Sequence, residues 1–175
     1  MKHVSGVFAF IKPVKIHIVI MRILMVCLGN ICRSPLAEGI MKAKAKKYKL
    51  NIEVDSAGTA AYHTGELPDS RSMEVALKNG IDISDQRARK FKPTDFDGFD
   101  KIFAMDPSNF SDLAALAQNN EHLEKLDLIL NMSQPGSNRA VPDPYYGGKD
   151  GFNNVFAMLD EACEVIAKKI SENHH

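Results

Sequence analysis

The chain alternates short apolar runs with longer segments of helical periodicity, and this alternation limits the possible folds more than any other feature. The apolar runs predict strands at 23–26, 52–54, 102–105 and 126–130. Periodicity and start and stop residues predict helices from Pro35 onward and over 68–79, 107–119 and 152–170. Strands that alternate with helices form a parallel sheet covered on both faces. We therefore predict an α/β fold of three layers with a four-stranded parallel sheet.

The charge balance excludes one broad class of partners. Among 175 residues, 22 are basic and 22 are acidic. A balanced chain has no overall electrostatic attraction for nucleic acid or for an anionic membrane, so we expect neither as a partner. Any attraction for a phosphate group must then be local.

The first 20 residues have a basic start and an apolar character. Lys12, Pro13 and Lys15 interrupt the run, and no small-residue cleavage pattern follows, so a signal peptide fits poorly. We expect residues 1–20 to be an extension, either poorly ordered or lengthening the first strand through residues 16–20. The folded domain is expected over residues 21–175.

Cysteine usage indicates a reducing compartment. The three cysteines, Cys27, Cys32 and Cys163, do not form the even framework of a secreted disulfide protein. Cys and His residues do not occur at zinc-ligand spacing. We expect a cytoplasmic protein without a metal or another cofactor.

The segment CLGNICRSP, residues 27–35, carries the strongest chemical signal. It places Cys27 and Arg33 in a tight turn between a predicted strand and a predicted helix. Such a turn directs backbone N–H groups and the helix dipole at an anion. Gly29 and Asn30 tolerate the positive φ angles that this requires. Arg33 supplies a planar fork for two phosphate oxygens, so the segment predicts a phosphate-binding loop.

The same surroundings favour the thiolate form of Cys27, which is the nucleophilic form. Ser34 is placed to donate its hydroxyl to that sulfur. A single cysteine between a strand and a helix is usually a small buried apolar residue. The combination with an arginine at the head of an apolar helix favours catalysis instead.

This loop resembles the signature of the low-molecular-weight protein tyrosine phosphatases, and the resemblance runs from about Met21 to Ile170. It implies that Cys27 attacks phosphorus, that Arg33 binds phosphate, and that Ser56 supports Asn30. The phosphate-binding loop that it implies comprises Leu28, Gly29, Asn30, Ile31, Cys32, Arg33 and Ser34.

A second segment, VPDPYYGG, resembles the loop that carries the general acid in this family. The resemblance assigns Asp143 as acid in the first step and as base in the second. Prolines on both sides restrict the backbone there. By the same resemblance Tyr145 and Tyr146 edge the pocket and Tyr62 forms the opposite wall, although such tyrosines also serve as plain loop anchors.

Two further positions are expected to modulate the loop. By resemblance, Cys32 forms a reversible disulfide with Cys27 that protects the nucleophile; a simple packing role is the alternative. Many bacterial relatives carry His after the second helix, to support the loop asparagine. Here Asp85 or Gln86 stands near that place, and a Gln amide still donates a hydrogen bond.

The sequence thus predicts hydrolysis of phosphotyrosine in proteins, with inorganic phosphate as a product and a bacterial tyrosine kinase as one candidate partner. An arsenate reductase on this fold needs further cysteines, and none lies between residues 51 and 120. Protein arginine phosphatases typically have Thr where this chain has Ile31. A non-catalytic phosphotyrosine reader is expected to have lost Cys27, Arg33 or Asp143.

Overall fold

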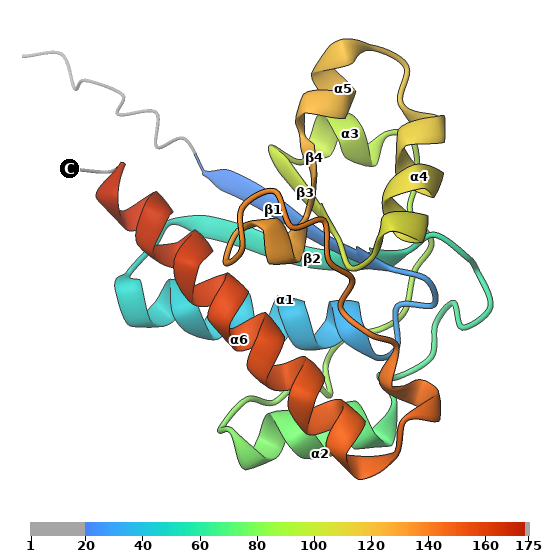
Figure 1. Cartoon of the computed structure of the whole chain (residues 1–175), viewed down its shortest axis with the longest axis vertical. Coiled ribbons are helices and arrows are strands. Elements are labelled where there is room, and N and C mark those ends of the chain that lie inside the picture. Colours follow the sequence, from blue (N-terminus) through green and yellow to red (C-terminus); the bar gives the residue numbers. More distant parts are fainter. Residues whose placement is uncertain (1–19, 174–175) are drawn as a thin grey trace, which may run out of the picture.

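The computed structural model describes residues 20–173 and contains one parallel sheet with the strand order β2-β1-β3-β4 (Figure 1). All three strand pairings are parallel, which confirms the predicted fold class. Most of the expected extension, residues 1–19, lies outside the described residues. The strands are β1 (Met21–Cys27), β2 (Ile52–Gly58), β3 (Lys101–Ala104) and β4 (Leu126–Leu128).

Helices cover both faces of the sheet. The long helices α1 and α6 pack against each other on one side, where α2 joins them, and three shorter helices lie on the other (Figure 1). The first group is α1 (Arg33–Tyr48), α2 (Ser70–Lys78) and α6 (Gly148–Glu172). The second group is α3 (Asp95–Gly98), α4 (Pro107–Leu116) and α5 (Asn120–Glu124).

From Ile23 to Cys27 the central strand β1 is buried on both faces, which explains its continuous apolar run. Ile23 and Met25 face the core that includes α1 and α6. Leu24 and Val26 face the second core, around Phe96. A strand covered on both sides has no solvent-facing positions, so its sequence shows no polar alternation.

Three local features differ from the sequence-based prediction. β2 continues to Gly58, so Ser56 lies in a strand and not in the predicted loop. β4 ends at Leu128, and the buried apolar run continues as a 3₁₀ helix, η1 (Ile129–Asn131). The prediction of strand up to residue 130 was therefore wrong at its end, because periodicity cannot separate a buried strand from a short buried helical turn. The short helices α3 and α5 were not predicted.

The fold brings several segment ends to one edge of the sheet. α1 begins just after the carboxyl end of β1, and α4 begins just after that of β3. Asp106 caps α4, and its Oδ1 accepts from the Asn109 N–H at 2.8 Å. Within residues 20–173 we find no helix that has both the length and the apolar character needed to cross a membrane.

Candidate active site

The predicted phosphate-binding loop follows β1, and neighbouring segments hold its carbonyl groups on the outside. A carbonyl held outward turns the next amide N–H toward the centre of the loop, where an anion would bind. The bonds are Thr59 N–H to Cys27 O (2.9 Å), Ala60 N–H to Leu28 O (2.9 Å), Asp69 N–H to Ile31 O (2.8 Å) and Ser72 Oγ to Cys32 O (3.3 Å).

Asn30 holds the turn of the loop in place. Its φ is 56°, in the left-handed region that Asn tolerates better than most residues. Its Nδ2 donates to Ser34 Oγ at 2.8 Å and to Ser56 Oγ at 2.9 Å. Its Oδ1 accepts from the Arg89 N–H at 3.0 Å. These bonds use both amide hydrogens and offset the strain of the positive φ.

The Cys27 sulfur lies inside this framework, and only 2% of the residue is exposed. Its Sγ is 3.0 Å from Ser34 Oγ, and it accepts from the Asn30 N–H at 3.3 Å. Because Asn30 Nδ2 donates to Ser34 Oγ, the Ser34 hydroxyl hydrogen can be donated to the sulfur at 3.0 Å or to the Ala57 carbonyl at 3.5 Å. Two groups, the Asn30 N–H and the Ser34 hydroxyl, thus lie within hydrogen-bond distance of one sulfur atom.

Arg33 is buried, with 4% of its side chain exposed, and is held from behind. Its Nη1 donates to Asp106 Oδ2 at 2.6 Å and to the Val141 carbonyl at 3.0 Å. Its Nη2 lies 3.8 Å from Asp143 Oδ2. A buried cation requires such a partner. Asp106 was not among the predicted site residues; its place soon after β3, at the same edge of the sheet, was the signal for this role.

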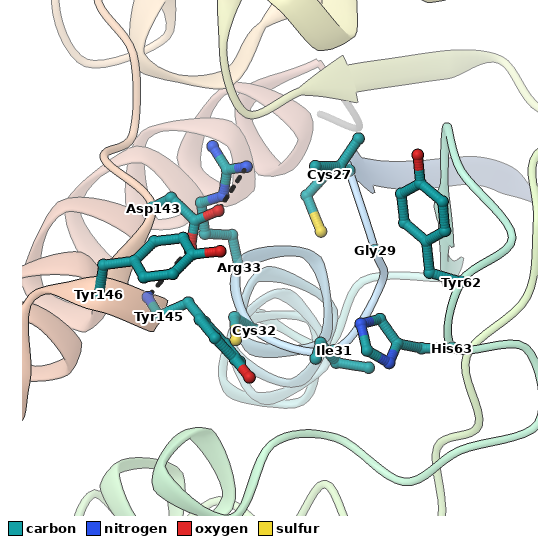
Figure 2. A pocket seen from close by; sticks show the side chains of 11 residues that line it. Cys27, Gly29, Ile31, Cys32, Arg33, Tyr62, His63, Asp143, Tyr145 and Tyr146 are labelled. Atoms are coloured by element: carbon teal, nitrogen blue, oxygen red, sulfur yellow. Dashed lines mark hydrogen bonds and ion pairs between the residues drawn. The ribbon is translucent and has the colours of Figure 1, made fainter.

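A pocket of about 300 Å³ opens above the Cys27 sulfur. Figure 2 shows Tyr62 and His63 on one wall and Asp143, Tyr145 and Tyr146 on the opposite wall. The lining also includes Leu28, Gly29, Ile31, Cys32 and Arg33. The structure therefore brings the three predicted catalytic residues and the three predicted wall tyrosines to one cavity.

His63 is a pocket residue that sequence reasoning missed. A Cβ atom on Gly29 would lie 3.1 Å from His63 Cδ2, so the imidazole sits directly over the glycine of the loop. His63 Nδ1 lies 2.8 Å from Glu66 Oε2. Its position next to Tyr62 was the single signal in the sequence.

The comparisons with known proteins agree with this geometry. The family described as low molecular weight phosphotyrosine protein phosphatase matches residues 22–175. The chain belongs to this family. A low molecular weight phosphotyrosine protein phosphatase of Schizosaccharomyces pombe is 40% identical over 153 residues, which cover 86% of this chain and 97% of that protein. The predicted family and enzyme class, a protein-tyrosine-phosphatase, are confirmed.

Solved structures of low molecular weight phosphatases share the fold. The protein tyrosine phosphatase of Entamoeba histolytica has a TM-score of 0.81 at 39% identity, over 89% of this chain and 99% of that chain. A structure described as a Drosophila arginine phosphatase has a TM-score of 0.79 at 33% identity, over 85% of this chain and 97% of that chain.

In this phosphatase a buried carboxylate extends the network around Asn30. Glu38, on α1, is 4% exposed, and its Oε2 accepts from Ser56 Oγ at 2.5 Å. Its Oε1 accepts from Lys42 Nζ at 2.5 Å. Burial raises the pKa of the Glu38 carboxyl above its ordinary value, although both hydrogen bonds oppose this. Sequence reasoning missed Glu38, because a glutamate in a helix is usually exposed.

The two positions expected to modulate the loop have clear surroundings. Gln86 does not contact Asn30: its Nε2 donates to the Pro35 carbonyl at 3.1 Å and so supports the first turn of α1. Cys32 is a free thiol, and burial, followed by the charge of Asp69, raises its pKa to about 12.

Cys163 is fully buried and lies in the core, and burial raises its pKa. Between residues 20 and 173, His, Cys, Asp and Glu side chains do not gather in a group able to hold a metal ion.

We predict that Glu38 makes the phosphatase less stable as pH rises. A folded-state pKa above the ordinary value of 4.5 means that the folded protein binds the proton more tightly than the unfolded chain. Stability is then lost as pH increases from the unfolded pKa through the folded one. Glu38→Gln should remove this loss, so its free energy of unfolding, relative to wild type, should increase as pH rises above the ordinary value of 4.5.

Urea denaturation at increasing pH measures the difference. Lys42→Met is the matched variant: without the ammonium group, the Glu38 pKa should rise further and the loss of stability should become steeper. A Glu38→Gln difference that does not change with pH would contradict the prediction.

Proposed function

We infer that the protein hydrolyses phosphotyrosine monoesters in proteins through a cysteinyl-phosphate intermediate, with Cys27 as nucleophile, Arg33 as phosphate clamp and Asp143 as general acid and base. The observation that carries this proposal is the Cys27 sulfur at the base of the pocket, facing the space between two walls (Figure 2). The low molecular weight phosphatase family to which the chain belongs supports it.

In the first step the Cys27 thiolate attacks phosphorus, and an S–P bond forms as the P–O bond to the tyrosyl oxygen breaks. The electron pair of that bond stays on the tyrosyl oxygen, which takes a proton from Asp143. Asp143 is suited to this role, because its side chain lies at the rim and remains 42% exposed. The dephosphorylated protein then leaves.

In the second step a water molecule attacks the cysteinyl phosphate. Asp143, now a carboxylate, takes a proton from the water, the S–P bond breaks, and the thiolate of Cys27 is restored. The Ser34 hydroxyl, 3.0 Å from the sulfur, stabilises the thiolate as the leaving group. Inorganic phosphate is the product.

Arg33 and the loop amides stabilise the charge on the transferring phosphoryl group. Asp106 and the Val141 carbonyl hold one side of the guanidinium, through Nη1. This leaves Nη2 directed toward the acid side of the pocket. A donor fixed in advance costs no reorganisation during the reaction.

The pocket walls favour an aromatic ester. Tyr62, which is 76% exposed, and Tyr146, which is 89% exposed, flank the opening on opposite sides and present ring faces or edges to a phenyl group. The sulfur lies at the base, so a short phosphoserine side chain would not reach it. Proteins that contain phosphotyrosine are thus the proposed substrates, and a tyrosine kinase remains one candidate among them.

Phosphoarginine is the second candidate substrate, and the likeness to the Drosophila arginine phosphatase structure favours testing it. Ile31 lines the pocket at the position where arginine phosphatases typically carry Thr. Its larger apolar side chain narrows the space for a guanidinium and leaves it without a hydroxyl partner. We therefore propose the tyrosyl ester in preference to the arginyl one.

We predict that wild-type protein hydrolyses a phosphotyrosyl peptide and that Cys27→Ser does not, while the variant still binds phosphate analogues. The loop amides and Arg33 remain in this variant, whereas the nucleophile is lost. Steady-state phosphate release, with a phosphoarginyl peptide alongside, is the measurement. Turnover of the arginyl peptide alone would replace the proposed substrate. Binding of both peptides without turnover would mean that the loop serves as a reader.

Asp143→Ala should slow hydrolysis most for esters with poor leaving groups, because their leaving oxygen needs the proton that Asp143 donates. We expect kcat/KM for a phosphotyrosyl peptide to fall by about 10²–10⁴-fold and that for an activated dinitrophenyl ester far less. A series of aryl phosphates measures the dependence on the leaving group. An equal loss across the series would rule out Asp143 as the acid.

Cys32 is proposed to protect the nucleophile by forming a disulfide with Cys27 after oxidation. Both are free thiols on one loop, which suits the reducing cytoplasm proposed for the protein. After peroxide and then a thiol reductant, wild type should regain most of its activity, whereas Cys32→Ala should not, because its Cys27 proceeds to irreversible oxidation states. Equal recovery of the two would show that Cys32 only packs.

A further inference from the structure

Arg71 links the phosphate-binding loop to the loop that carries Asp143. It lies in the first turn of α2, next to the capping residue Asp69. The Asp69 N–H donates to the Ile31 carbonyl at 2.8 Å, which ties this end of α2 to the phosphate-binding loop. Arg71 donates to the Asp69 carboxylate through Nε at 3.0 Å and Nη2 at 2.9 Å. A fork bound in this way has a fixed orientation.

The remaining guanidinium nitrogen of Arg71 contacts the loop that carries Asp143, residues 141–148, which we call the acid loop. Its Nη1 donates to the Tyr145 carbonyl at 3.0 Å. Its guanidinium carbon lies 5.0 Å from the centre of the Tyr145 ring and 4.7 Å from that of Phe152, in the first turn of α6. One guanidinium therefore contacts the 3₁₀ helix η2 (Pro144–Tyr146) and the start of α6.

Asp143 lies between two anchors of its loop. On one side the Val141 N–H donates to Met105 O at 2.8 Å, and the Val141 carbonyl accepts from Arg33. On the other side the Tyr145 carbonyl accepts from Arg71. Asp143 Oδ1 itself accepts from the Tyr145 N–H at 3.0 Å, so the carboxylate moves with the residue that Arg71 holds.

We propose that Arg71 is a positioning residue for proton transfer: it fixes the distance between the acid loop and the phosphate-binding loop, and thereby places the Asp143 carboxyl at the leaving oxygen. This deepens the proposed function and rests on the role of Asp143 as acid. Arg71 is not among the residues that line the pocket. Replacing Arg71 should therefore slow hydrolysis only of substrates whose leaving oxygen must be protonated.

The test uses Arg71→Met, which keeps an apolar chain between the two rings but removes every donor. The measured quantity is kcat/KM, which reports the steps up to formation of the cysteinyl phosphate, over aryl phosphates from an activated dinitrophenyl ester to a phosphotyrosyl peptide. We expect a loss of about tenfold or more for the peptide and of less than about threefold for the activated ester. Arg71→Lys, which keeps the charge without the fork, should lie between wild type and Arg71→Met.

Lys78→Met is the matched control, because Lys78 is a cation at the far end of the same helix, paired with Glu74. This variant should leave kcat/KM unchanged for every ester of the series. In an Asp143→Ala background, Arg71→Met should add little further loss, since the two residues act through one proton. Thermal unfolding of each variant checks that it is folded.

The outcomes separate this proposal from the proposed function. If Asp143→Ala lowers kcat/KM equally for every ester of the series, Asp143 is not the acid, and the positioning role of Arg71 fails with it. If Asp143→Ala depends on the leaving group but Arg71→Met does not, the acid stands and the role of Arg71 is overturned. An Arg71→Met effect confined to KM for the peptide would make Arg71 a substrate contact instead, and would likewise overturn the proposal.

Discussion

The left-handed turn at Asn30 is the constraint on which the rest of the site depends. A loop that directs its amides inward needs a residue at positive φ, and Asn30 has a φ of 56°. The side chain of the same residue offsets that strain with three hydrogen bonds, to Ser34, Ser56 and the Arg89 N–H. Because Ser34 in turn contacts the Cys27 sulfur, the backbone geometry of the loop and the polar surroundings of that sulfur are set together. Glu38, behind Ser56, completes a chain of buried polar groups in which each member has a partner.

At Arg33 the cost of burying a charge is offset by an ion pair. Burying a guanidinium costs several kcal/mol unless it is paired, and Asp106 supplies the pair at 2.6 Å. The same carboxylate caps α4 with its other oxygen. One residue thus satisfies the orphan N–H of a helix and the cation of the pocket, and it joins the carboxyl ends of β1 and β3 at the place where parallel sheets bind ligands.

The sequence predicts the features that contiguous residues form, and it misses those that depend on contacts between side chains far apart in the chain. The phosphate-binding loop and the strands are contiguous segments, so residue type and spacing predict them, whereas the resemblance to the family pointed to the segment around Asp143. Asp106, Glu38, His63 and Arg71 join the site through contacts with residues far away in the chain, as in the pair Arg33 and Asp106, which are 73 positions apart. Such pairings follow from topology and not from local pattern. The end of β4 was wrong for a related reason: Ile129 and Leu130 are as buried as a strand would be, and burial alone does not specify backbone conformation.

The position of α6 at the end of the chain has a consequence for synthesis on the ribosome. The phosphate-binding loop and α1 emerge early, but the Arg33 contact with Val141 spans 108 residues, and the Lys47 contact with Glu164 spans 117. Each of these contacts forms only after its later partner residue has been made. A nascent chain therefore carries Cys27 long before it carries Asp143, and the apolar face of α1 stays uncovered until α6 docks. The pocket that joins Cys27 to Asp143 can thus be assembled only late in synthesis.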